Sequence, residues 1–212
     1  MKRFLIADDH SITRSGLKLV LREHFQPDLI DEATNGAEIM TLVKANKYDF
    51  MTMDVNMPNT DALSLVETIK IFQPEIKILV LSMNKEEIFA QSFIAKGAIG
   101  YIQKSASEDE LLWAIRSVIR GSVYLSEDVA NVLLQKKTSR SNSDNPLFML
   151  TSRELQIFQY LVRGDTLSNI ASVMSLSQST IATHKANILR KLKLENLHDL
   201  IQLANTHHLN GA

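Results

Sequence analysis

Residues 48–58 read Tyr-Asp-Phe-Met-Thr-Met-Asp-Val-Asn-Met-Pro, a sequence in which a short apolar run ends in the carboxylate of Asp54. Two more carboxylates, Asp8 and Asp9, follow the first apolar run of the chain, and Lys104 follows the last run of its first half. If these runs are parallel strands of one sheet, their polar ends meet at its carboxyl edge, where open α/β sheets place their chemistry. We therefore expect three carboxylates and one ammonium group to lie together there.

Around this stretch, apolar runs alternate with helix-period segments from residue 3 to about residue 120. The runs are short and mostly apolar rather than alternating, which is typical of parallel strands that are covered on both faces. Strands are expected at Phe4–Ala7, Leu29–Ala33, Asp49–Met53, Ile76–Leu81 and Ile99–Gln103. Helices are expected at residues 11–24, 36–46, 61–72, 85–95 and 107–120, the last with a capping box of Ser107 and Glu110 and an end at Gly121. This order predicts an α/β domain over residues 1–121, a five-stranded, parallel, doubly wound sheet of flavodoxin-like type.

The pattern changes after Leu125. An amphipathic stretch from Glu127 to Leu134 is followed by a polar run to Pro146, and we expect residues 122–146 to form a linker. From Leu147 the periodicity is purely helical, and Thr151 with Glu154 forms a second capping box. Helices are expected from this box to Gly164 and at Leu167–Met174, Thr180–Leu192 and Leu197–Asn205. The tight connection between the second and third of these helices is typical of a helix-turn-helix. We therefore expect a small all-α, four-helix, helix-turn-helix domain over residues 147–212.

Composition limits the classes of function. The chain has 212 residues, enough for one ordinary domain and a small one, and it has no cysteine, which excludes disulfides and thiolate metal sites. Only five apolar or small residues precede Asp8, too few for a signal sequence or a membrane span, so we expect a cytoplasmic protein. Residues 147–212 hold six basic and four acidic side chains, a small surplus that permits nucleic-acid binding without establishing it.

The three carboxylates supply hard oxygen ligands of the kind that Mg²⁺ prefers. A carboxylate that attacks phosphorus becomes an acyl phosphate, and a metal ion with Lys104 would offset the charge on the transferred group. Asp54 is the expected nucleophile because it alone ends a central strand. Taken singly, Asp8 and Asp9 could be a helix cap with a solvated neighbour, Ser82 a turn residue, Tyr101 a half-buried aromatic and His10 a solvated loop residue.

The motifs also carry a resemblance to known families. The first half resembles the receiver domain of bacterial two-component response regulators in Asp8-Asp9, Asp54-Val-Asn-Met-Pro58, Ser82 and Gly97-Ala-Ile-Gly-Tyr101-Ile-Gln-Lys104. The second half resembles a LuxR-type helix-turn-helix in Leu150-Thr-Ser-Arg-Glu154 and Leu176-Ser-Gln-Ser-Thr180-Ile-Ala-Thr-His184-Lys-Ala-Asn187-Ile-Leu-Arg-Lys191-Leu. Together they resemble the NarL/FixJ family of transcriptional regulators over nearly the whole chain apart from the linker.

The resemblance implies roles for the matched residues of the first half. Asp54 would accept phosphate from a histidine kinase, and Mg²⁺ would be held by Asp9, Asp54 and the main-chain carbonyl of Asn56, with Asp8 acting through water. Lys104 would pair with the phosphate. Ser82 and Tyr101 would form the switch, on a face made by residues 85–95, 99–103 and 107–120. The chain departs from the usual glycine-rich loop after Met57-Pro58, where it reads Asn59-Thr60-Asp61-Ala62.

In the second half, the helix at residues 180–192 would be the recognition helix. The residues expected to contact DNA are Ser179, Thr180, Thr183, Lys185, Asn187 and Lys191, the last on the phosphate backbone. Ala182 and Ala186 offer no hydrogen-bond donor there. Alternatively, the basic side chains of this helix form only a solvated face and do not contact DNA. The last helix, through Leu197, Leu200, Ile201 and Ala204, resembles a dimerising helix, and the alternative for it is core packing.

The predicted function is therefore a response regulator in which phosphorylation of Asp54 controls dimerisation and binding to specific double-stranded DNA. It would not be an enzyme beyond self-catalysed phosphotransfer and dephosphorylation. One alternative is a Mg²⁺-dependent aspartyl phosphatase, although its nucleophile would end the first strand, which here ends in Asp8-Asp9. A second alternative is a regulator that binds partners or DNA without phosphorylation.

Overall fold

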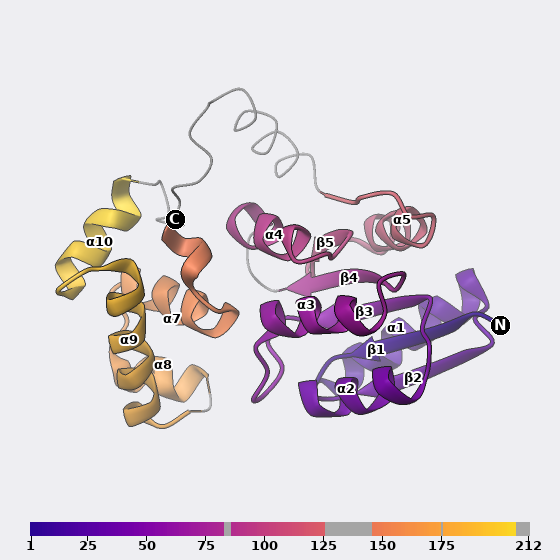
Figure 1. The fold of residues 1–212 in the computed structure, drawn as a ribbon, viewed down its shortest axis with the longest axis horizontal. Helices are drawn as coiled ribbons and strands as arrows, with labels where there is room; N and C mark the ends of the chain where they lie inside the picture. The colour runs from indigo at the N-terminus through magenta and orange to yellow at the C-terminus, as the bar shows by residue number, and fades with distance from the viewer. Residues whose placement is uncertain (83–85, 126–145, 175, 207–212) are drawn as a thin grey trace. The chain divides into compact units, whose positions relative to one another are not determined.

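The computed structural model describes residues 1–82, 86–125, 146–174 and 176–206 (Figure 1). The chain divides into two compact units, residues 1–142 and 143–212, which we name the sheet unit and the helical unit. The amphipathic stretch expected at Glu127–Leu134 lies outside the described residues. Within the described residues, no helix combines the length and the apolar character needed to cross a membrane.

The sheet unit contains the predicted parallel sheet. Its strands are β1 (Arg3–Ala7), β2 (Leu29–Ala33), β3 (Phe50–Asp54), β4 (Lys77–Ser82) and β5 (Gly100–Gln103), in the order β2-β1-β3-β4-β5. All four neighbouring pairs are parallel. Every residue of β3 is buried, as expected for a central strand covered on both faces. The flavodoxin-like prediction is confirmed.

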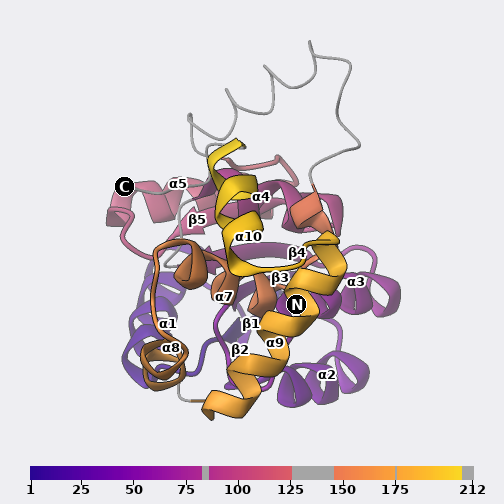
Figure 2. The ribbon, with the colours of Figure 1, turned by 90° about the vertical axis from the view of Figure 1, so that its left-hand side faces the viewer.

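Helices cover both faces of this sheet (Figure 2). They are α1 (Ser11–Phe25), α2 (Gly36–Ala45), α3 (Ala62–Phe72), α4 (Glu86–Ala95) and α5 (Glu108–Ile119), each within one residue of its predicted bounds. Helices α1 and α5 pack on one face, and α2, α3 and α4 lie along the other. Ser107 caps α5 as predicted, since its hydroxyl accepts the N–H of Glu110 at 3.2 Å.

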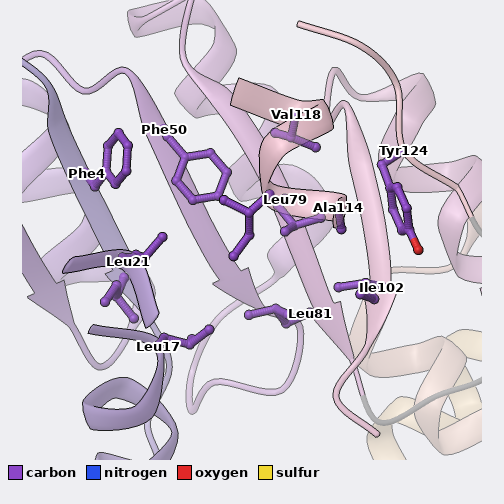
Figure 3. Packing of buried hydrophobic residues seen from close by; sticks show 12 residues of the cluster. Phe4, Leu17, Leu21, Phe50, Leu79, Leu81, Ile102, Ala114, Val118 and Tyr124 are labelled. Atoms are coloured by element: carbon purple, nitrogen blue, oxygen red, sulfur yellow. The ribbon is translucent and has the colours of Figure 1, made fainter. Parts of the chain in front are cut away.

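The core between the sheet and helices α1 and α5 is built from large apolar side chains (Figure 3). The rings of Phe4 and Phe50 meet edge to face, with centroids 5.2 Å apart. Tyr124 belongs to this core and forms a parallel bridge with Gly100 of β5. Tyr124 of the expected linker thus packs on the sheet unit, whereas the linker from residue 126 to residue 145 lies outside the described residues.

The helical unit consists of a 3₁₀ turn η1 (Pro146–Met149) and helices α7 (Ser152–Val162), α8 (Leu167–Val173), α9 (Gln178–Leu192) and α10 (Leu197–Thr206). The predicted box at the start of α7 is present, because the Thr151 hydroxyl accepts the N–H of Glu154 at 3.3 Å and the Glu154 carboxylate accepts the N–H of Thr151 at 2.8 Å. Gly164 ends the α7 segment with a φ of 87°. Helix α9 begins two residues earlier than predicted, because Ser177 caps it through the N–H of Thr180.

Candidate functional site

The topology of the sheet brings the acidic residues together. Strands β1 and β3 are neighbours, whereas the chain between them forms β2 on the opposite side of β1. Such a reversal of strand order opens a crevice at the carboxyl ends of the two strands. Asp8 follows β1 and Asp54 ends β3, so both carboxylates lie at this crevice. Lys104 reaches it from the end of β5.

Lys104 bridges the two buried carboxylates. Its Nζ lies 2.7 Å from Oδ2 of Asp8 and 2.8 Å from Oδ2 of Asp54. Both carboxylate side chains are fully buried, and Lys104 is 12 % exposed. The N–H of Asn56 donates to Oδ1 of Asp54 at 3.0 Å, and the N–H of His10 donates to Oδ1 of Asp8 at 2.8 Å. The predicted cluster of carboxylates and one ammonium group is therefore present.

Burial and pairing set the protonation of this cluster. Burial raises the pKa of the Asp54 carboxyl above its usual value, while Lys104 and the N–H of Asn56 act in the opposite direction. Burial also lowers the pKa of Lys104, but the carboxylates of Asp54 and Asp8 outweigh that effect and raise it overall. The Lys104 ammonium group therefore stays charged at neutral pH.

The cluster fits a small divalent cation. Asp8, Asp9, His10 and Asp54 can each offer one ligand atom, and these atoms all lie within 4.8 Å of one another. The side-chain Oδ1 of Asn56 is buried and has no hydrogen-bond partner among the described residues. Hard oxygen donors around a partly open position are the set that Mg²⁺ uses when it retains water and phosphate ligands.

His10 lies closer to the acids than the sequence indicated. Its Nδ1 is 3.1 Å from Oδ1 of Asp8 and 2.9 Å from Oδ1 of Asp9, although the side chain is 65 % exposed. It is thus a largely exposed loop residue, as expected, whose ring also contacts the acidic cluster. Its position directly after the Asp8-Asp9 pair was the only signal in the sequence.

Ser82 lies on β4, the strand next to Asp54, and Tyr101 lies on β5, one strand further out. Ser82 is buried at the end of β4, and its carbonyl accepts the N–H of Lys104 at 2.7 Å. The ring of Tyr101 is fully buried and packs against Phe93 of α4, with centroids 6.0 Å apart. The structure thus places Ser82 beside the site and the Tyr101 ring inward, against α4.

The loop after Met57-Pro58 is ordered without a glycine. Asn59 takes the left-handed conformation, with a φ of 51°. The Thr60 hydroxyl donates to the carbonyl of Pro58 at 2.8 Å and accepts the N–H of Gly36 at 2.9 Å, which ties the loop to the start of α2. Asp61 then caps α3 through Ser64. These bonds account for the tolerated departure from a glycine-rich loop.

In the helical unit, α9 presents a polar face. Ser179 and Thr183 are exposed, while Thr180, Lys185 and Asn187 are partly exposed. The Thr183 hydroxyl donates to the carbonyl of Ser179 at 2.9 Å. The predicted DNA-contacting residues thus share one helix and reach its surface.

Lys191 is an exception within that set. Its Nζ lies 2.6 Å from Oε2 of Glu154, and the Glu154 side chain is only 5 % exposed. The Lys191 ammonium group therefore also has a structural role, and its contact with the DNA backbone stays a prediction. Arg153 has a similar structural role, since its guanidinium donates to the carbonyl of Met174 at 3.0 Å and links α7 to the end of α8.

The predicted dimerising residues of α10 fall into two groups. Leu200 and Ala204 are fully buried and pack within their own unit, so the alternative of core packing is correct for both. Leu197 and Ile201 remain partly exposed. Of the four predicted residues, only this second pair has side-chain surface left for an interface.

Each half of the chain matches a known protein family. The family described as "Response regulator receiver domain" matches residues 4–116, and the family described as "Bacterial regulatory proteins, luxR family" matches residues 149–204. The chain belongs to the response regulators. This family assignment confirms the predicted NarL/FixJ resemblance and the predicted class, a phosphorylation-regulated, DNA-binding transcription regulator that is in general not an enzyme.

This response regulator is similar to other response regulators over most of its length. It is 33 % identical over 209 residues to the oxygen regulatory protein NreC of Staphylococcus aureus strain JH9, covering 95 % of this chain and 96 % of that protein. Among solved structures, the RcsB response regulator of Salmonella typhimurium has a TM-score of 0.61 at 20 % identity, covering 97 % and 100 % of the two chains. A LuxR-family response regulator from Aurantimonas sp. SI85-9A1 has a TM-score of 0.57 at 26 % identity, covering 65 % of this chain and 98 % of that one.

Proposed function

We propose that Asp54 of this response regulator accepts a phosphoryl group from a histidine kinase or a small phosphodonor. An oxygen of the Asp54 carboxylate would attack phosphorus, the bond from phosphorus to the donor nitrogen or oxygen would break, and its electron pair would leave with the donor. The single observation that carries the proposal is the position of Asp54 at the end of β3, with Lys104 bonded at 2.8 Å. That ammonium group is placed to pair with the added phosphate.

The metal in this proposal is Mg²⁺. Asp9, Asp54 and the main-chain carbonyl of Asn56 would hold it, with Asp8 acting through water. When bound, the ion neutralises charge on the phosphoryl oxygens. Main-chain groups of the protein position the carboxylates. The N–H of Asn56 orients one oxygen of Asp54, and the N–H of His10 orients Asp8.

Phosphorylation adds about two negative charges at Asp54. In the proposal, the Ser82 hydroxyl turns toward the new oxygens and the ring of Tyr101 shifts with it, which changes the face formed by α4, β5 and α5. That change favours a dimer and stronger binding to double-stranded DNA. Leu197 and Ile201 of α10 would contribute to the dimer. The DNA would be contacted from α9 by Ser179, Thr180, Thr183, Lys185, Asn187 and, on the phosphate backbone, Lys191.

The proposed division of the chain follows from these roles. A receiver domain ends with α5, a connector of residues 122–146 begins on the surface of β5, and the DNA-binding domain starts at Leu147. Self-catalysed transfer and loss of the phosphoryl group would be its only reactions. The proposed location is the cytoplasm, where both the kinase and the DNA are reached.

A labelling experiment tests the phosphoacceptor. The full chain with Mg²⁺ and radiolabelled acetyl phosphate should gain acid-stable, base-labile label, as an acyl phosphate does. Asp54→Asn should remove that label, and Asp61→Asn provides a matched control because Asp61 caps α3 outside the acidic cluster. Label that persists in Asp54→Asn would contradict the assignment, and Asp61→Asn should keep the wild-type label.

A further inference from the structure

Tyr124 lies in the connector, yet its backbone pairs with the sheet. Its N–H donates to the carbonyl of Ile99 at 2.9 Å, and its carbonyl accepts the N–H of Tyr101 at 3.2 Å. These two bonds flank Gly100, the bridge partner of Tyr124. Because β5 is the last strand in the sheet order, the bonds occupy its outer edge, where strand backbone groups otherwise lack partners.

The side chain of Tyr124 makes a second attachment, to α5. The ring is 8 % exposed and lies with Ala114 and Val118 in the core beneath that helix (Figure 3). Its hydroxyl donates to Oε1 of Glu110, in the first turn of α5, at 3.1 Å. One connector residue therefore binds β5 by its backbone and α5 by its side chain.

Strand β5 also leads to the phosphorylation site, because Lys104 follows it directly. Tyr101, the residue whose N–H Tyr124 holds, packs its ring against Phe93 of α4. The strand continues into Lys104, whose N–H donates to the carbonyl of Ser82 and whose ammonium group donates to Asp54. A displacement of β5 by a new group on Asp54 therefore acts directly on the hydrogen bonds of Tyr124.

We propose that Tyr124 is a positioning residue that clamps the outer edge of β5 to the start of the connector. Through this clamp, the change at Asp54 is transmitted along β5 to the segment that leads to the DNA-binding unit. The inference rests on the proposed function, because it needs phosphorylation to alter DNA binding. It adds the route by which the signal leaves the receiver domain.

The test uses the full chain and the ratio of its dissociation constants for a selected DNA duplex without and with beryllofluoride and Mg²⁺. Beryllofluoride mimics the phosphoryl group, and ¹⁹F NMR reports its binding separately from DNA affinity. For the wild type we expect a ratio on the order of ten or more. Tyr124→Leu should still bind beryllofluoride and keep the backbone bonds to β5. Its ratio should fall to about 1, because the bond to Glu110 and the ring packed beneath α5 are lost.

Tyr48→Phe is the matched control. The Tyr48 hydroxyl donates to Asp31 at 2.7 Å, at the opposite end of the sheet, so its loss removes a tyrosine hydrogen bond without touching β5. Its ratio should equal that of the wild type. Glu110→Gln should also keep the wild-type ratio, because an amide oxygen still accepts the bond from Tyr124.

The outcomes separate the two proposals. A wild-type ratio retained in Tyr124→Leu would overturn the clamp alone, whereas a ratio of about 1 in the wild type itself would overturn the proposed function and the clamp with it. If Tyr124→Leu does not bind beryllofluoride, the clamp is tested with Tyr124→Phe instead. That variant keeps the ring and loses only the bond to Glu110, so its ratio should drop by about threefold, and an unchanged ratio would contradict the clamp.

Discussion

Lys191 and Glu154 form an ion pair at 2.6 Å, and the same carboxylate oxygen accepts the N–H of Thr151 at 2.8 Å. One carboxylate thus caps α7 and binds α9. Replacing Lys191 by Met would leave the nearly buried charge of Glu154 without its cation. We expect the free energy of unfolding of the helical unit to fall by about 2 kcal/mol, measured by urea unfolding.

The matched control for that variant is Lys193→Met. Lys193 follows α9 and is exposed, so the same loss of a positive charge should change stability by less than about 0.5 kcal/mol. If both variants lost the same free energy of unfolding, net charge would be the cause and the ion pair between Lys191 and Glu154 would not.

His184 predicts a pH dependence of stability. It faces Glu154, Arg153 and Lys191, its Nδ1 is buried without a hydrogen-bond partner in the described part of the chain, and burial lowers its pKa from 6.5. The unfolded chain therefore binds a proton before the folded one does, so stability falls as pH decreases through about 6.5. His184→Gln should lose less stability than the wild type between about pH 7.5 and pH 5.5, measured by urea unfolding.

His198→Gln is the control for that experiment, because His198 is exposed on α10. It should keep the wild-type loss of stability at acidic pH. An identical pH dependence in His184→Gln and the wild type would show that another group is responsible.

Replacing glycine by alanine should lower stability at position 100 and raise it at position 16, because only the first site lacks room for a Cβ atom. A Cβ at Gly100 would lie 2.6 Å from Cγ2 of Val118 and 2.7 Å from Cδ1 of Leu79, both in the core. Gly100→Ala should lower the free energy of unfolding by about 1–3 kcal/mol. Gly16→Ala, where nothing lies within 4 Å, should raise it by about 0.5–1 kcal/mol because alanine favours the helix. Thermal unfolding that shows the same sign for both would contradict this packing.

Thr52 predicts a stabilising substitution. It lies in β3 between Ile6 and Leu79, and its buried Oγ1 has no hydrogen-bond partner among the described residues. Thr52→Val replaces the hydroxyl by a methyl group of similar size and should raise the free energy of unfolding by about 1 kcal/mol. Thr41→Val, at an exposed position of α2, should change it by less than about 0.5 kcal/mol. Lower stability in Thr52→Val would indicate that the hydroxyl has a partner.

The sequence was sufficient for the sheet and for the acidic cluster. Short apolar runs that end in Asp54 or continue into Asp8 determine both the strand and the edge at which each carboxylate lies, so periodicity and strand order were enough. Capping boxes likewise located the starts of α5 and α7. In each case the information is local to a few consecutive residues.

The sequence was not sufficient where a contact depends on residues far apart. Lys191 and Glu154 are 37 residues apart, and nothing near Lys191 distinguishes a paired ammonium group from a DNA contact. Leu200 and Ala204 show the same helical period whether they face the core or a second subunit. Tyr124 lies between Val123 and Leu125, and a single residue that pairs with a strand leaves no periodic pattern.

The central claim is that a phosphoryl group on Asp54 increases DNA binding. It is tested most directly by selecting DNA from a random pool with the full chain, with and without beryllofluoride and Mg²⁺, and then measuring the affinity for the selected sequence in both states. The account predicts tighter binding with beryllofluoride in the wild type and no change in Asp54→Asn. Equal affinity in the two states of the wild type, with beryllofluoride shown to be bound, would contradict it.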